Sequence, residues 1–177
     1  MRIFEDVLTG DEVMTDAIPF TLEYEGTIMK VQTAYVNADS DDIEVYAAGE
    51  FDSANNAGGD GEPVEKVLNV VKSANLQQVT LDKKQFMAYI KEYLKKIVPI
   101  IEKTDAEKVD KFKEQITIFT KNMVKNFDEL EFYCGKNSYD EDEDKIKGAI
   151  IISMWEDESA SAPVFYYIND GLKAVKV

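Results

Sequence analysis

The sequence predicts an α+β protein with mixed or antiparallel strand pairing, a two-helix hairpin and one long loop. Apolar residues alternate with a period of two near the start of the chain, which is typical of half-buried strands, and apolar runs near its end are typical of buried strands. Between them, residues 80–127 carry apolar side chains every three or four positions, as amphipathic helices do. Strands followed by two helices and then by strands indicate an α+β arrangement.

Length and composition restrict the classes of protein to which this chain can belong. At 177 residues it is long enough for one domain, 1–177, and its 45% hydrophobic content excludes an acidic disordered chain. The single cysteine, Cys134, excludes an intrachain disulfide, and the absence of histidine excludes His-based catalysis. A structural zinc site needs about four Cys or His ligands. We therefore expect neither a zinc site nor His-based catalysis.

Charge and hydropathy bear on location and partners. A net charge of −15 repels nucleic acid and anionic membranes. No apolar run approaches the roughly 18 residues of a transmembrane helix. The first residues, 1–6, turn acidic at once, unlike a signal peptide. We expect a cytoplasmic protein that does not bind nucleic acid or span a membrane.

The first third of the chain is predicted to contain short strands and then a loop. Ile3 and Phe4 begin an edge strand, and an acidic, turn-rich stretch follows over 6–16. Period-two alternation continues through 20–24 and 28–32. Polar, acidic and glycine-rich residues over 37–63 predict a long flexible loop, either disordered or ordered for binding.

The middle of the chain leads into the helical hairpin. Apolar, mostly β-branched residues over 64–71 favour a strand over a short helix. The first hairpin helix begins after Thr80 or Asp82, either of which can cap it. Pro99 removes a backbone donor, so we expect a kink or an early end near Val98.

The second helix and the C-terminal strands complete the pattern. A connection at 103–105, with Thr104 or Asp105 as the next cap, leads to an amphipathic helix that reaches Phe127. Strands are expected at 132–134, where Cys134 is a core residue, and at 148–155 and 164–168. A turn follows at 169–171.

Five consecutive acids at 140–144 begin like a calcium loop. An EF-hand needs Gly at its sixth position and Glu at its twelfth, where this chain has Lys145 and Ile151. Two alternatives stay open: a weak, non-EF-hand calcium site at Asp140, Asp142 and Asp144, or a solvated hairpin tip. A second acidic cluster over 39–44 has the same two interpretations.

The hairpin is the net-basic segment of an acidic chain. Residues 80–127 hold 11 lysines against seven Asp and Glu, a net charge of +4, whereas the rest of the chain carries −19. The lysines either solvate the outer helix faces or form a docking surface for an acidic partner. The candidate contact residues are Lys83, Lys84, Lys91, Lys95, Lys96, Lys103, Lys108, Lys111 and Lys113.

Several passages, in order along the whole chain, resemble the translationally controlled tumour protein family. They include the acidic element of Asp11, Glu12 and Asp16, the helix passage 88–95, and 132–135 followed by acids. The resemblance implies a small twisted, β-tent-like sheet core with a projecting helical hairpin and a long flexible loop.

The resemblance also implies functions. It implies weak calcium binding, binding to tubulin and microtubules through the hairpin, and roles in growth control and protection against cell death, with apoptosis regulators as partners. It further implies a link to small Ras-like GTPases, as an exchange factor or chaperone, with Glu12 as the contact. A purely structural or chaperone role is a third alternative, favoured by the strong negative charge.

Overall fold

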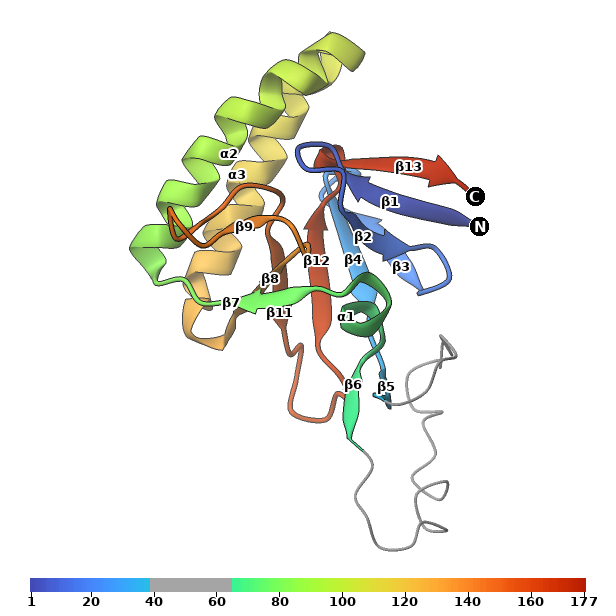
Figure 1. Ribbon diagram of the computed structural model, residues 1–177. Helices are drawn as coiled ribbons and strands as arrows, with labels where there is room; N and C mark the ends of the chain where they lie inside the picture. Colours follow the sequence, from blue (N-terminus) through green and yellow to red (C-terminus); the bar gives the residue numbers. More distant parts are fainter. Residues whose placement is uncertain (39–64) are drawn as a thin grey trace, which may run out of the picture.

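The computed structural model describes residues 1–38 and 65–177, and its elements form three layers (Figure 1). A six-stranded sheet lies in the middle, the helical hairpin covers one face, and a three-stranded sheet covers the other. The predicted α+β class with a helical hairpin is therefore confirmed. The predicted loop, apart from Asn37 and Ala38, lies outside the described residues.

All pairs in the central sheet are antiparallel. In spatial order its strands are β3 (Phe20–Glu23), β4 (Ile28–Gln32), β12 (Val164–Ile168), β11 (Ile151–Met154), β8 (Glu131–Cys134) and β7 (Gln77–Val79). Strand β12 is buried along its whole length, which explains its continuous apolar sequence.

Three smaller sheets surround the central one. They are β13 (Leu172–Lys176), β1 (Arg2–Asp6) and β2 (Glu12–Thr15); β9 (Tyr139–Asp140) with β10 (Lys145–Ile146); and β5 (Tyr35–Asn37) with β6 (Lys66–Leu68). The prediction that residues 3–4 begin an edge strand is wrong, because β1 lies between β13 and β2. The turn at 169–171 is confirmed as a 3-10 helix, η4 (Asn169–Gly171).

The helical hairpin consists of α2 (Lys83–Thr104) and α3 (Val109–Lys125), joined through the 3-10 turn η2 (Ala106–Lys108). Asp82 is the N-cap of α2: its side chain accepts a hydrogen bond from the Gln85 amide, and the Gln85 side chain accepts one from the Asp82 amide. A second 3-10 turn, η3 (Phe127–Glu129), follows α3. The hairpin extends beyond the sheets at the end where its helices connect (Figure 1).

Of the two outcomes predicted near Val98, a kink or an early end, the early end is wrong, because α2 continues through Pro99 to Thr104. Pro99 and Lys95 are both exposed, so water can hydrogen-bond the Lys95 carbonyl that has lost its helical donor. Ile97 and Ile101, on either side of the proline, are buried in the core and hold the helix in place.

The predicted strand over 64–71 is only partly correct. Strand β6 covers Lys66–Leu68, but a short helix, α1 (Asn69–Ala74), begins directly after it. The Asn69 carboxamide oxygen accepts hydrogen bonds from the amides of Ala34 (3.1 Å) and Val70 (2.8 Å) and thereby turns the chain. Asn75 ends the helix in the left-handed conformation. These contacts override the strand propensity of Val70 and Val71, which lie in α1.

Two hydrophobic clusters fill the spaces between the layers. The alternation along β4 sends Ile28 toward the hairpin and Met29 toward the three-stranded sheet. Strand β12 divides its side chains in the same way, with Tyr166 in the first cluster and Tyr167 in the second. Both faces of the central sheet are therefore buried, and the apolar face of the hairpin is part of the core.

Candidate functional site

Polar contacts fix the hairpin on the sheet so that its outer faces are presented to solvent. The Tyr89 hydroxyl donates to the Gly148 carbonyl (2.6 Å) and accepts from the Ile150 amide (2.9 Å). On α3, the Asn122 side chain donates to the Tyr24 hydroxyl (2.9 Å). These bonds hold both helices in one orientation relative to the sheet, which a rigid docking surface requires.

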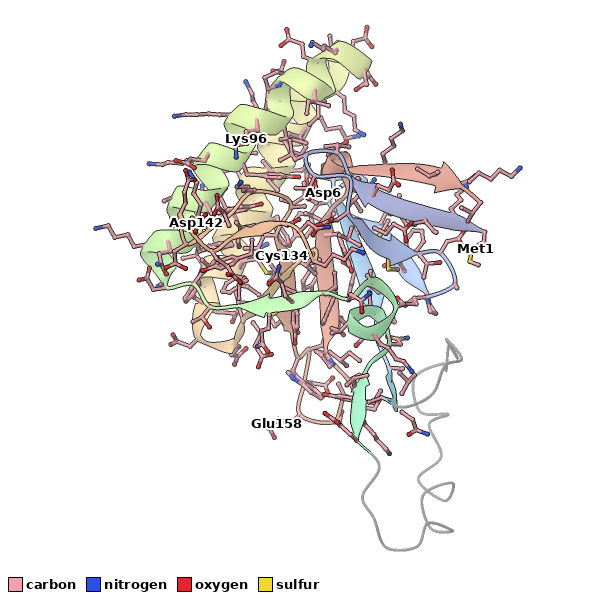
Figure 2. All side chains as sticks on the ribbon, in the orientation of Figure 1. Met1, Asp6, Lys96, Cys134, Asp142 and Glu158 are labelled. Carbon is pink, nitrogen blue, oxygen red and sulfur yellow. The ribbon has the colours of Figure 1, made fainter. Side chains whose placement is uncertain are left out.

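Seven of the nine predicted contact lysines form the hairpin lysine surface. Each is exposed and lies beyond ion-pair distance of every acid that the structure describes. They are Lys83, Lys84, Lys91, Lys95, Lys96, Lys103 and Lys113. Spacings of seven and four residues place Lys84, Lys91 and Lys95 on one face of α2. Lys96 also lies on α2 (Figure 2).

The other two predicted lysines form ion pairs with acids of the same chain. The Lys108 ammonium pairs with the largely buried carboxylate of Asp170, and Lys111 approaches Glu25 at 3.7 Å. Both acids come from turns of the sheet, at sequence positions far from the hairpin. A partner therefore meets these two lysines already paired.

The predicted GTPase-contact residue, Glu12, lies on an exposed edge of the molecule. It begins β2, an outer strand of the three-stranded sheet, and its side chain is exposed. Its antiparallel partner in β1 is Glu5, so two carboxylates occupy paired positions. A pocket of about 180 Å³ adjoins it. The pocket is lined by Met1, Ile3, Glu12, Met14, Thr15, Ser73 and Ala74.

Two buried acids of the same segment have a different role. The Asp6 carboxylate accepts hydrogen bonds from the amides of Leu8 (2.9 Å) and Ala149 (2.7 Å). The Asp11 carboxylate accepts from the Asn137 amide (2.9 Å), the Asn137 side chain (3.0 Å) and the Ser138 hydroxyl (2.9 Å). This buried carboxylate pair fastens the chain after β1 to the segment between β8 and β11.

Sequence reasoning treated 6–16 as an acidic turn and missed this pair. Asp6 and Asp11 accept from backbone amides in the segment between β8 and β11, which lie 143 and 126 residues away in the sequence. No local sequence pattern can therefore predict these hydrogen bonds. The one available signal is the pair Gly135 and Gly148, since a Cβ at either position would collide with one of these carboxylates.

The acid run lies at the tip of the β9–β10 hairpin. One Asp140 oxygen accepts from the amides of Asp142 (3.0 Å) and Glu143 (3.2 Å), and the other pairs with Lys147 (3.0 Å). The hydrogen bond with Lys147 lowers the pKa of the Asp140 carboxyl. Asp144 accepts from the Tyr139 hydroxyl. Within the described part of the chain, no three carboxylates are grouped so that they could hold a metal ion.

Cys134 lies fully buried in β8, as predicted for a core residue (Figure 2). Burial, together with the nearby Asp11 and Asp6 charges, raises the pKa of its thiol to about 12. The thiol is therefore protonated at neutral pH. Only the deprotonated thiolate acts as a nucleophile, so Cys134 is not reactive.

Comparison with known proteins identifies the family. The family model for translationally controlled tumour protein matches residues 1–173. The chain belongs to this family. It is 33% identical, over 181 residues and 99% of both chains, to translationally-controlled tumor protein homolog 1 of Dictyostelium discoideum. The solved structure of the translationally controlled tumor-associated protein p23fyp from Schizosaccharomyces pombe matches the whole of both chains with a TM-score of 0.74 and 26% identity.

The passages that resemble the translationally controlled tumour protein family occupy different environments here. In the helix passage 88–95, Tyr89 and Tyr93 stack on each other and face the core, whereas Lys91 and Lys95 are exposed. In the acidic element, Asp11 is buried and Glu12 is exposed. Each passage thus combines residues that hold the fold with residues available to a partner. No described helix of this family member is long and apolar enough to cross a membrane.

Proposed function

We propose that this member of the family is a non-enzymatic cytoplasmic protein that binds tubulin and stabilises microtubules through the hairpin lysine surface. The observation that carries the proposal is that seven lysines of the hairpin are exposed and form no ion pair with any acid that the structure describes. The chain as a whole has a net charge of −15. Tubulin is acidic, and the hairpin is the net-basic segment of this acidic chain, so its lysines attract tubulin where the rest of the chain carries net negative charge. Reversal of its lysines, read by microtubule co-sedimentation, tests the proposal.

The proposed biological role is growth and survival control, with apoptosis regulators as further partners. Family membership supports this part of the proposal. A pull-down with wild-type protein and with the lysine-reversed protein, at two salt concentrations, tests whether those partners use the same surface. Partners held by the hairpin lysines are lost from the reversed protein and weaken as salt rises.

Weak calcium binding at the β9–β10 tip is the proposed second property. It requires the carboxylates of the tip to move together around the ion, because they are not grouped as a metal site in the described structure. We expect calorimetry to detect a dissociation constant of about 10⁻⁴ to 10⁻³ M. Joint neutralisation of Asp140, Asp142 and Asp144 to asparagine removes the heat of binding. Lys147→Ala tightens binding, because it releases the Asp140 oxygen that Lys147 now occupies.

The matched control for the calcium experiment neutralises three exposed acids elsewhere, Asp128, Glu129 and Glu158, and leaves the heat unchanged. Heat that survives the triple change at the tip would rule out this location. The acidic cluster over 39–44, outside the described residues, would then be the next to neutralise.

A regulator of small Ras-like GTPases, acting as an exchange factor or chaperone, is the second candidate function. The observation that favours it is the exposure of Glu12 on an outer strand, beside a pocket with apolar lining. We expect Glu12→Gln to abolish any acceleration of nucleotide release. The same change relieves repulsion between paired carboxylates, so unfolding in urea shows equal or slightly higher stability, by about 0.2–1 kcal/mol.

Glu5→Gln is the matched control, because it relieves the same repulsion from the paired position. It keeps the nucleotide-release activity if Glu12 is the contact. Equal loss in both variants would assign the effect to the shared electrostatics of the strand pair, and no acceleration by the wild-type protein with any candidate GTPase would reject this function.

A further inference from the structure

A cleft separates the connecting end of the hairpin from the sheet of β1 and β13. Its volume is about 560 Å³. Ile100, Ile101 and Leu172 give it apolar walls, and four charged side chains, Asp105, Lys108, Asp170 and Lys173, line it. This cleft is separate from the exposed face of α2 that carries Lys84, Lys91 and Lys95, so it is independent of the tubulin proposal.

The carboxylate of Asp170 is only half satisfied. Its side chain is 4% exposed, one oxygen pairs with the Lys108 ammonium, and the other oxygen is buried without a hydrogen-bond partner among the described residues. The Tyr93 hydroxyl, which lies against Gly171, is also buried and unpartnered there. A buried carboxylate oxygen without a donor is costly, so this position favours a ligand that brings one.

The chemistry of the missing donor points to a guanidinium group. An ammonium such as that of Lys108 is a point charge and here contacts one oxygen, whereas the planar guanidinium presents two parallel N–H groups that match both carboxylate oxygens. The methylene stem of an arginine side chain can pack on the apolar walls. The cleft is larger than one such side chain requires, which leaves room for a neighbouring apolar residue of the same ligand.

We propose that this cleft binds an arginine side chain presented by a partner protein, and that the arginine displaces Lys108 from Asp170. Lys108 is 41% exposed, so its ammonium can move into water when it leaves the carboxylate. The Lys108 ammonium contacts one carboxylate oxygen only, and so competes weakly with a guanidinium that would contact both. Lys108 thus occupies one oxygen of the Asp170 carboxylate in the absence of the partner.

Titration of the ¹⁵N-labelled full-length protein with acetyl-Leu-Arg-Gly-amide tests the proposal by NMR. We expect saturable shifts of the Gly171 and Leu172 amides, and several-fold weaker binding of the peptide with Lys in place of Arg. Lys108→Ala removes the competitor and strengthens binding several-fold. Asp170→Asn removes the charged acceptor and weakens binding at least about tenfold.

Lys173→Ala is the matched control, because it removes one positive charge from the same cleft without touching the ion pair. Three results would each overturn the proposal: equal strengthening by the two lysine variants, equal binding of the Arg and Lys peptides, and no shift near Gly171. If acetylarginine amide binds as tightly as the peptide, the claim that the arginine is presented by a partner protein is overturned. If Asp170→Asn fails to fold, the comparison of the two lysine variants and of the two peptides still tests the proposal.

Discussion

Microtubule co-sedimentation falls at least about tenfold when Lys91, Lys95 and Lys96 are reversed to glutamate. Each reversal replaces an attraction to the acidic tubulin surface by a repulsion. All three side chains are exposed and without an ion pair among the described residues, so their reversal leaves no buried group unpaired. Lysine and glutamate have similar helix propensities, and the hairpin therefore stays folded, as circular dichroism will show.

The control for net charge reverses three exposed lysines outside the hairpin, Lys136, Lys173 and Lys176. It gives the chain the same total charge and retains most of the binding. If both triple variants lose binding equally, the protein's overall charge and not the hairpin governs association. Unchanged co-sedimentation of the hairpin variant would exclude the hairpin lysine surface as the site.

The salt dependence of binding further separates the contribution of the hairpin lysines from that of the protein's overall charge. Exposed charges are screened over about 10 Å at 0.1 M ionic strength, so binding of the wild-type protein weakens as salt rises. The hairpin variant has already lost these attractions, and its residual binding depends less on salt. Parallel salt dependence of the two proteins would mean that other charges carry the contact.

The hairpin was predictable because its information is local. A cap at Asp82 and apolar residues at three- and four-residue spacing specify α2 wherever the helix packs. The pairing of Lys108 with Asp170 was not predictable, because it depends on how η4 meets the hairpin in space. From the sequence, all nine lysines therefore look alike, and only the fold divides them into seven that are exposed and unpaired and two that are held.

The N-terminal segment shows the opposite situation. The stretch 6–16 was predicted only as acidic and turn-rich, because its local pattern gives no sign of the distant donors that bury two of its acids. Asp6 and Asp11 find their donors on the segment between β8 and β11. The same limit applies to α1, where Asn69 directs the chain through a bond to Ala34. Each error replaced a long-range polar contact by a local propensity.

The importance of the buried carboxylate pair can be measured directly. Asp11→Ala is expected to lower the free energy of unfolding by about 2–4 kcal/mol, because the Asn137 amide and the buried Ser138 hydroxyl lose their common acceptor. Asp11→Asn keeps one acceptor oxygen and loses about half as much. Urea denaturation followed by circular dichroism gives both values.

The neighbouring Glu12→Ala is the matched control, since Glu12 is exposed and its loss changes stability by no more than about 1 kcal/mol, through relief of the repulsion from Glu5. A value that small for Asp11→Ala would show that solvent replaces the lost bonds and that the pair does not fasten the two segments. A large loss at Asp11 with none at Glu12 assigns adjacent acids to different tasks. Asp11 then holds the strand, and Glu12, the residue after it, is left free to meet a partner.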